Sequence, residues 1–297
     1  MQPILQAQNL RFCYDSGAPA LDGVSLDVHA GERIAVLGPN GAGKSTFFLC
    51  LNGVLTPESG QIVLQGKPVD KKMRKTLCER VGIVFQNADD QIIASTVAAE
   101  VSFGPMNLRL PRQEVARRVD HALDYMDLQA FRARPPHDLS GGEKKRVSIA
   151  DILAMESEII LLDEPAASLD PVGEERLERV LARLSDEGRT LLISTHDMDF
   201  AFRWATRAVV FSAGRILADG TPQTVLANQA VLRQAHLRRP MLLEVWDALR
   251  ARELVPQDAP CPRTPEELTR LLDHQRDSGN TASFSKHDLR VNYAVLP

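Results

Sequence analysis

Eight consecutive residues near the start of the chain have the types and spacing of a phosphate-binding loop. They are Gly38, Pro39, Asn40, Gly41, Ala42, Gly43, Lys44 and Ser45, which fit the pattern G-x-x-x-x-G-K-[ST]. The glycines let backbone N–H groups turn towards phosphate oxygens, and the N-terminus of a following helix favours the same anion. Lys44 can reach the β- and γ-phosphates, and Ser45 can hold Mg²⁺. The motif predicts a nucleotide-binding site and leaves a kinase, a GTPase and an ATPase all open.

A run of apolar residues that ends in two carboxylates is the second chemical signal. It reads Ile159-Ile160-Leu161-Leu162-Asp163-Glu164. Four apolar residues in a row are typical of a strand inside a parallel sheet. Asp163 would emerge at the carboxyl end of that strand, where open α/β sheets bind ligands. Beside a phosphate loop Asp163 can hold Mg²⁺ and Glu164 can polarise the attacking water; alone, the pair could equally be a solvated acidic turn.

The segment Leu139-Ser140-Gly141-Gly142-Glu143 permits two compatible interpretations. Ser140 and Glu143 have the spacing of a capping box, which predicts the start of a helix. A capped helix start with two glycines also exposes free N–H groups and therefore offers an anion site. In that site Ser140 can accept a backbone N–H bond while its hydroxyl donates to a phosphate.

Alternating strand and helix patterns surround these motifs and predict an α/β fold with a parallel sheet. Residues 33–37 are almost continuously apolar and run directly into the glycine-rich loop, as a buried parallel strand would. We expect further strands at 24–28, 60–65, 81–86, 159–162 and 190–194. We expect one helix from 44 to about 51 and another over 171–187, with Asp170 as its N-cap.

Strand-like patterns disappear between about residues 89 and 154. Apolar residues there take helical spacing over 112–128. We therefore expect a helical subdomain that is inserted between strands of the sheet.

The strand–helix alternation fades after residue 228. We expect a nucleotide-binding domain over residues 1–228 and a C-terminal extension over 229–297. Within the extension, Thr264, Pro265 and Glu267 predict the start of a helix. The extension could join a dimer interface, regulate the domain or form a loosely held end.

Composition limits the class of protein. The chain has 297 residues, of which 44% are hydrophobic and 25% charged, and its net charge is −4. These values are ordinary for a globular protein and do not indicate a broad basic surface for nucleic acid. No apolar run approaches the ~18 residues of a spanning helix, and the N-terminus does not read as a signal peptide. The four cysteines and seven histidines are scattered, so we expect reduced thiols and no zinc site.

Six motifs, taken in order along the chain, resemble the nucleotide-binding subunits of ABC transporters. They are the glycine-rich loop, Gln86, Leu139-Ser140-Gly141-Gly142, Asp163-Glu164, Ser168-Leu169-Asp170 and His196. The resemblance covers about residues 3–228. It implies a P-loop NTPase with a RecA-like core, an antiparallel β subdomain and an inserted helical subdomain.

Two further segments narrow the resemblance. Residues 85–92 and 103–108 look like the ATPase subunits of energy-coupling-factor (ECF) importers. Residues 139–150 look most like the cobalt and nickel branch of these proteins, often called CbiO.

The resemblance implies ATP and Mg²⁺ as cofactors and assigns residues to them. Thr46 would join the glycine-rich loop in binding the nucleotide. Tyr14 would stack on adenine, with Phe12 as the competing candidate. Ser45, Gln86 and Asp163 would form the metal site.

The resemblance also implies the catalytic set and the dimer contacts. Gln86 would sense Mg²⁺ and the attacking water, and His196 would contact the γ-phosphate and help to orient the water and Glu164. The signature residues Ser140, Gly141 and Gly142 would contact the γ-phosphate bound by a second subunit, and Asp170 would cross the dimer interface. The positions that depart from the usual family pattern are Glu143 for Gln, Ala166 for Thr and Ser168 for Gly.

By resemblance, the chain is an ATPase that powers import across a membrane which it does not itself cross. It would lie at the cytoplasmic face of the cell membrane, bound to a transmembrane coupling protein and a substrate-binding membrane subunit. Two copies, or this chain and a paralogue, would sandwich two ATP molecules. Cobalt or nickel is the expected cargo, with a vitamin such as biotin as the alternative. A soluble ABC ATPase and a non-catalytic interaction subunit are the rival classes.

Overall fold

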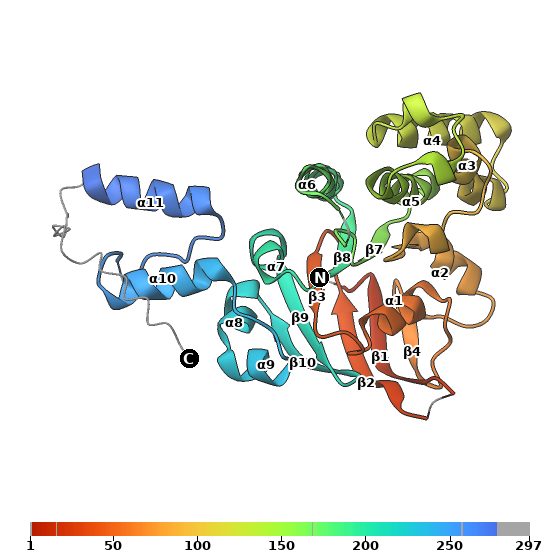
Figure 1. Ribbon diagram of the computed structural model, residues 1–297. Coiled ribbons are helices and arrows are strands. Elements are labelled where there is room, and N and C mark those ends of the chain that lie inside the picture. Colours follow the sequence, from red (N-terminus) through yellow and green to blue (C-terminus); the bar gives the residue numbers. More distant parts are fainter. Residues whose placement is uncertain (1, 16, 168, 257, 278–297) are drawn as a thin grey trace, which may run out of the picture. The chain divides into compact units, whose positions relative to one another are not determined.

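The computed structural model describes residues 2–15, 17–167, 169–256 and 258–277 (Figure 1). The chain divides into two compact units, Met1–Arg238 and Arg239–Pro297. The domain boundary expected after residue 228 stays a prediction. Ser168 and the end of the extension, residues 278–297, lie outside the described residues.

A six-stranded sheet forms the centre of the first unit. Its strands are β3 (Arg33–Leu37), β6 (Val81–Val84), β7 (Ile159–Asp163), β8 (Thr190–Ser194), β9 (Arg207–Ser212) and β10 (Arg215–Gly220). Their order is β10-β9-β3-β8-β7-β6, and all pairs are parallel except β10 with β9. β7 and β8 are buried along their whole length, which explains their continuous apolar sequence. The predicted parallel sheet is therefore confirmed.

A second, antiparallel sheet precedes most of the first along the chain. It contains β1 (Leu5–Cys13), β2 (Pro19–Val28), β4 (Ser59–Leu64) and β5 (Lys67–Pro68) in the order β2-β1-β4-β5. Residues 24–28 alternate between buried and exposed, as predicted for a strand with one covered face. This sheet is the antiparallel β subdomain that the resemblance implied.

Helix α1 (Lys44–Asn52) links the two sheets through a shared core. One cluster of buried side chains includes residues from β1, β2, β3, β4, α1 and β7. Phe47 and Phe48 of α1 are fully buried, and the Phe47 ring lies 5.2 Å from the Phe211 ring of β9. Burying such a side chain contributes about 1.5–3 kcal/mol. The core therefore holds the first turn of α1, and with it the glycine-rich loop, in place.

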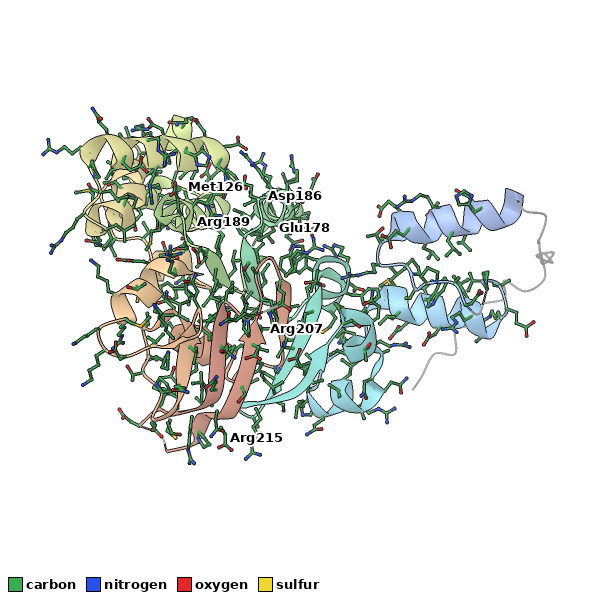
Figure 2. All side chains as sticks on the ribbon, turned by 180° about the vertical axis from the view of Figure 1, so that it is seen from behind. Met126, Glu178, Asp186, Arg189, Arg207 and Arg215 are labelled. Atoms are coloured by element: carbon green, nitrogen blue, oxygen red, sulfur yellow. The ribbon has the colours of Figure 1, made fainter. Side chains whose placement is uncertain are left out.

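Two arginines, labelled in Figure 2, fasten β10 to its neighbours. Arg207 pairs with both carboxylate oxygens of Asp219 at 2.6 Å and also contacts Glu32 at 3.3 Å. Arg215 pairs with Asp22, which connects β10 to β2 of the antiparallel sheet. The two sheets are thus joined by the Arg215–Asp22 ion pair as well as by the apolar core.

Three helices form the predicted helical subdomain: α3 (Val97–Asn107), α4 (Arg112–Tyr125) and α5 (Gly141–Met155). In Figure 1 they lie together as one yellow and green group. α4 ends at Tyr125, earlier than the predicted residue 128, because Asp127 takes a positive φ of 52° and the Leu128 N–H bonds back to Leu123.

Among the described residues, the remaining α-helices of the first unit are α2 (Arg74–Arg80), α6 (Pro171–Asp186), α7 (Met198–Trp204), α8 (Pro222–Ala227) and α9 (Gln229–Gln234). Asp170 caps α6 as predicted, since its carboxylate accepts from the Gly173 N–H at 2.7 Å. The second unit contains α10 (Met241–Ala251) and α11 (Pro265–Asp277). The predicted helix start is confirmed there by the bond from the Glu267 N–H to the Thr264 hydroxyl.

Candidate active site

The glycine-rich loop connects β3 to α1 through backbone conformations that only glycine adopts easily. Gly38 has φ 147° and Gly43 has φ 103°. A Cβ on Gly38 would lie 2.4 Å from the Phe211 carbonyl oxygen, and a Cβ on Gly43 would lie 2.4 Å from the Ala20 carbonyl oxygen. Any side chain at either position would therefore clash with backbone. The loop is a cradle that places backbone N–H groups at the N-terminus of α1, where phosphate groups bind.

Lys44 extends across this loop. Its buried ammonium donates to the Gly38 carbonyl at 2.7 Å and to the Pro39 carbonyl at 3.2 Å. Burial lowers the pKa of Lys44, whereas the charges of Glu164 and Asp163 raise it. The structure therefore brings this cation close to both carboxylates that the sequence singled out.

Asp163 and Glu164 are held at the end of β7 by Ser194 of β8. The Ser194 hydroxyl donates to the Asp163 carboxylate. The Glu164 N–H bonds to the Ser194 hydroxyl at 2.9 Å and lies 3.1 Å from the Ser194 carbonyl. Glu164 itself has φ 44°, an uncommon conformation for a non-glycine residue. The chain thus turns sharply after Asp163, and the Glu164 side chain lies beyond the end of the strand.

Glu164 faces His196. The Oε2 atom of Glu164 lies 2.9 Å from His196 Nδ1, and Glu164 is only 8% exposed. The Oε1 atom of Glu164 is buried and has no hydrogen-bond partner among the residues that the structure describes. A carboxylate with one oxygen held and the other free can accept a proton from a water molecule. The His196 side chain is 75% exposed, so its ring can reach a ligand outside the sheet.

The residues of this edge also fit Mg²⁺. Ser45 lies exposed in the first turn of α1, and Asp163 is the last residue of β7 in the same sheet that leads into α1. Hydroxyl and carboxylate oxygens are the ligands that Mg²⁺ prefers, together with phosphate oxygens and water.

Tyr14 lies next to the same helix. Its hydroxyl is 3.2 Å from the Thr46 hydroxyl, and the residue is 48% exposed. Phe12 packs against the core and meets the Tyr14 ring edge-on at 5.0 Å. Tyr14 therefore offers the more accessible aromatic face, and Phe12 supports it from behind.

Gln86 is exposed, and its backbone is held by the helical subdomain. The buried Lys145 ammonium of α5 donates to the Phe85 carbonyl at 2.8 Å and to the Gln86 carbonyl at 2.6 Å. The pKa of Lys145 is lowered to about 8, because the effect of burial outweighs the charge of Asp163, which raises the pKa. Lys145 thus joins the helix that begins at Ser140 to the segment that contains Gln86.

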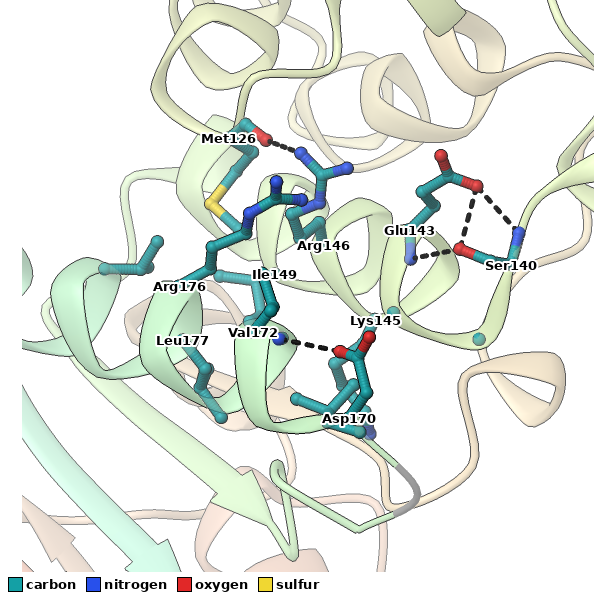
Figure 3. Close-up of a pocket in the computed structure, with 15 residues that line it drawn as sticks. Met126, Ser140, Glu143, Lys145, Arg146, Ile149, Asp170, Val172, Arg176 and Leu177 are labelled. Carbon is teal, nitrogen blue, oxygen red and sulfur yellow. Dashed lines mark hydrogen bonds between the residues drawn. The ribbon is translucent and has the colours of Figure 1, made fainter.

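The signature residues line a separate pocket between α5 and α6, shown in Figure 3. Its volume is about 330 Å³, and Ser140, Gly141, Gly142 and Asp170 contribute to its wall. The described residues that line it include none from the glycine-rich loop. One chain therefore carries the signature residues and the phosphate loop in different places.

The capping box predicted at the signature is confirmed, with one difference. Ser140 accepts from the Glu143 N–H at 3.3 Å, as expected. Its hydroxyl does not point to open space, however, because it donates to the Glu143 carboxylate at 2.9 Å.

Two residues that sequence reasoning missed support this site. Ser194 stands directly opposite Asp163 in the register of β7 and β8, and strand alignment could have suggested it. Lys145 reaches a carbonyl 60 positions earlier in the chain. The local sequence indicated only that a charged residue stands on an otherwise buried face of the helix.

Comparison with known proteins agrees with this geometry. A family model described as ABC transporter matches residues 21–167. The energy-coupling factor transporter ATP-binding protein EcfA2 of Methanospirillum hungatei is 42% identical over 276 residues, which are 92% of this chain and 69% of that protein. EcfA of Methanocaldococcus jannaschii is 46% identical over 255 residues, which are 85% of this chain and 91% of that protein.

Solved structures agree as well. CbiO1 from Clostridium perfringens, described as part of the ABC transporter complex CbiONQ, is 39% identical with a TM-score of 0.70, covering 83% of this chain and 100% of that one. A dimeric ATP-binding cassette in a post-hydrolysis state, bound to ADP and phosphate, is 27% identical with a TM-score of 0.67, covering 73% and 98%.

The fold, the phosphate loop and these matches define an ABC transporter ATPase. More particularly, the chain belongs to the energy-coupling factor transporter ATP-binding proteins, the ATPase subunits of ECF importers. Among the residues that the structure describes, no helix is both long and apolar enough to cross a membrane.

Proposed function

We propose that two copies of this chain hydrolyse ATP between them, with each site formed by the glycine-rich loop of one copy and the signature residues of the other. The observation that carries this proposal is the separation of the two groups in one chain: Ser140, Gly141 and Gly142 line a pocket whose described wall contains no residue of the glycine-rich loop. One structural neighbour, an ATP-binding cassette bound to ADP and phosphate, is itself dimeric, which supports the pairing of two copies. A dimer of this chain with a paralogue is the alternative.

Each side chain at the edge of the sheet has a proposed task. Lys44 and the loop N–H groups bind the β- and γ-phosphates, and Tyr14 stacks on adenine. Mg²⁺, when bound by Ser45, Asp163 and Gln86, supplies positive charge at the phosphate oxygens.

Glu164 accepts a proton from the attacking water through its free Oε1 atom. His196 orients Glu164 from the other oxygen, at 2.9 Å, and presents its exposed ring edge to the γ-phosphate. The signature helix of the second copy stabilises the charge that develops on that phosphate.

We further propose that the helical subdomain meets the transmembrane coupling protein. Three large apolar side chains on and before α3 are strongly exposed: Ile93 at 71%, Phe103 at 51% and Met106 at 63%. Exposed apolar residues grouped on one subdomain are typical of a protein–protein contact. Closure of two copies on ATP would move this surface and so drive transport from the cytoplasmic face of the membrane.

Cobalt or nickel is the cargo that we propose. The support is the sequence of residues 139–150, where α5 begins, and the likeness to CbiO1. A vitamin such as biotin is the second candidate, because the ATPase chain does not itself hold the cargo.

The variant Glu164→Gln tests the proposed chemistry. It should bind ATP, lose turnover by about 10²- to 10⁴-fold and accumulate as an ATP-dependent dimer, since the fold is kept and only the base is lost. Phosphate release and gel filtration with ATP measure both effects. A variant that stays monomeric at saturating ATP, or one that hydrolyses ATP normally, would contradict the proposal.

The partners are tested by isolating the tagged chain from membranes in mild detergent. Mass spectrometry should find a multi-spanning coupling protein and a small membrane subunit, and the latter would identify the cargo. Recovery of ribosomal or other water-soluble proteins alone would favour the rival soluble ABC ATPase.

A further inference from the structure

Glu143 accepts hydrogen bonds from both donor groups of Ser140, the first of the signature residues. The Ser140 backbone N–H donates to Glu143 Oε2 at 2.7 Å, and the Ser140 hydroxyl donates to the same oxygen at 2.9 Å. The hydroxyl oxygen accepts in return from the Glu143 N–H, so the three bonds form a closed set, drawn in Figure 3. A hydroxyl has a single proton. Ser140 therefore cannot donate to a phosphate while it donates to Glu143.

Glu143 also brings a negative charge to this position. The pKa of Glu143 is lowered, above all by the bond from the Ser140 backbone N–H, and further by the Ser140 hydroxyl, Arg146 and Arg134. The side chain is thus a carboxylate at neutral pH. It lies in the first turn of α5, where the positive end of the helix stabilises an anion. The same helix end is the one that would receive the γ-phosphate.

Resting on the two-copy site proposed above, we propose that Glu143 is a positioning residue that opposes closure and sets the ATP concentration at which two copies associate. Closure requires Glu143 to release the Ser140 hydroxyl so that this hydroxyl can turn to the γ-phosphate. Closure also brings two negative groups, the Glu143 carboxylate and the γ-phosphate, to the same end of α5. A glutamine at this position would still accept through its amide oxygen but would carry no charge, so it would hold the Ser140 hydroxyl proton less strongly than the carboxylate does.

The size of the effect follows from Coulomb's law. One unit charge several ångströms from a phosphate, in a site that stays partly open to water, changes an equilibrium by about three- to tenfold. Salt screens such an interaction. An effect of Glu143 on helix formation would be screened by salt as well, so it is distinguished by a change in melting temperature.

The experiment compares full-length chains that carry Glu164→Gln, so that ATP is bound and not consumed. The ATP concentration at half-maximal dimer formation is measured by analytical ultracentrifugation with and without Glu143→Gln. We expect Glu143→Gln to lower that concentration about three- to tenfold, and the difference to shrink between about 0.05 M and about 0.5 M NaCl. Melting temperature, measured in parallel, should change little because the capping bond to the Ser140 N–H is kept.

Glu156→Gln is the matched control, because it removes one negative charge at the other end of α5. It should leave the ATP concentration for dimer formation unchanged. Glu143→Ala provides a second test that does not rely on the amide of glutamine. This variant should also lower the ATP concentration at half-maximal dimer formation. Its melting temperature should fall, because the capping bond is lost.

The outcomes separate the two proposals. If the parent chain and the Glu143→Gln variant form dimers at the same ATP concentration, the role of Glu143 is refuted and the two-copy site stands. An equal response to Glu156→Gln would likewise refute it, since the effect would then be one of net charge. If the parent chain forms no ATP-dependent dimer at all, the two-copy site and the role of Glu143 are both overturned.

Discussion

Tyr14 and Phe12 differ in exposure, and this difference decides which of the two rings can stack on adenine. Both are aromatic and both precede the glycine-rich loop, but Phe12 packs on the core whereas Tyr14 is 48% exposed beside Thr46. Stacking needs an open ring face, and the hydroxyl is not required for it.

We therefore expect Tyr14→Ala to weaken binding of a fluorescent ATP analogue markedly, because a base–aromatic stack contributes about 1–3 kcal/mol. Tyr14→Phe should have little effect. Phe12→Ala should have an intermediate effect through loss of support behind the ring. A Phe12→Ala variant that binds more weakly than Tyr14→Ala would show that Phe12 is the stacking residue.

Asp151 of α5 is a half-buried acid whose charge is poorly compensated. Its Oδ2 atom accepts from the Gln91 amide at 3.2 Å, but its Oδ1 atom is buried without a hydrogen-bond partner in the described part of the chain. The pKa of Asp151 is raised well above 3.8, first by burial and then by the charge of Glu100. The folded state therefore holds this proton more tightly than the unfolded chain does.

The sign of the pH dependence follows from that shift. Stability that Asp151 contributes is present below its unfolded pKa of 3.8 and is lost as pH rises through the higher folded pKa. Asp151→Asn keeps an acceptor for Gln91 and removes the charge. Urea unfolding should show the variant to be more stable by on the order of 1 kcal/mol at about pH 8, with a smaller gain at about pH 5. A gain that does not change with pH would contradict this account.

Among the secondary-structure elements, α5 connects the signature residues to the segment that contains Gln86. It begins at the signature, and two adjacent lysines in its second turn hold the segment after β6. Lys145 binds the Phe85 and Gln86 carbonyls, and Lys144 pairs with Asp89 at 2.6 Å. A movement of α5 is therefore transmitted to the backbone of Gln86.

Lys145→Met tests this connection. It leaves two carbonyls without their donor, so we expect ATP turnover to fall about tenfold while binding of the ATP analogue to the glycine-rich loop is retained. Lys144→Met is the matched control at the neighbouring position. Its ion pair is partly exposed and is worth about 0–1 kcal/mol, so turnover should stay close to that of the parent. Equal losses in both variants would refute a special role for Lys145.

The whole chain consists of two units, each with buried side chains of its own. The first unit ends at Arg238 and contains both sheets, the glycine-rich loop and the signature helix. The second contains α10 and α11, with Leu243 and Trp246 buried.

We expect a chain of residues 1–238 to fold cooperatively and to bind ATP, because every proposed ligand of the nucleotide lies within it. Thermal unfolding and titration with the ATP analogue measure both properties. Aggregation, or a loss of binding despite a folded spectrum, would show that the second unit is needed for the first.

Sequence patterns were sufficient where the physical cause is local. The glycine-rich loop, the apolar strands β3, β7 and β8 and the caps at Ser140, Asp170 and Thr264 depend on residues that are close together in the chain. Steric freedom at glycine, burial on both faces of a strand and capping bonds all act over a few positions. The family resemblance added the antiparallel sheet, whose alternation is weak in β1.

Contacts between distant segments required the folded chain. Ser194 meets Asp163 across a strand pair, and Lys145 meets Phe85 across 60 positions. The partners of such residues are set by sheet order and helix packing, which no short pattern encodes. The end of α4, and strands β9 and β10, were likewise not apparent from local sequence.

The amino-acid sequence was therefore enough to establish a nucleotide-binding α/β protein of the ABC class and to predict the residues that carry its chemistry. The fold was needed to show that His196 contacts one oxygen of Glu164 while the other has no partner among the described residues, and that the Ser140 hydroxyl donates to Glu143. The reason is that residue type and spacing specify which groups are present, whereas direction and distance between side chains arise only when the strands and helices pack together.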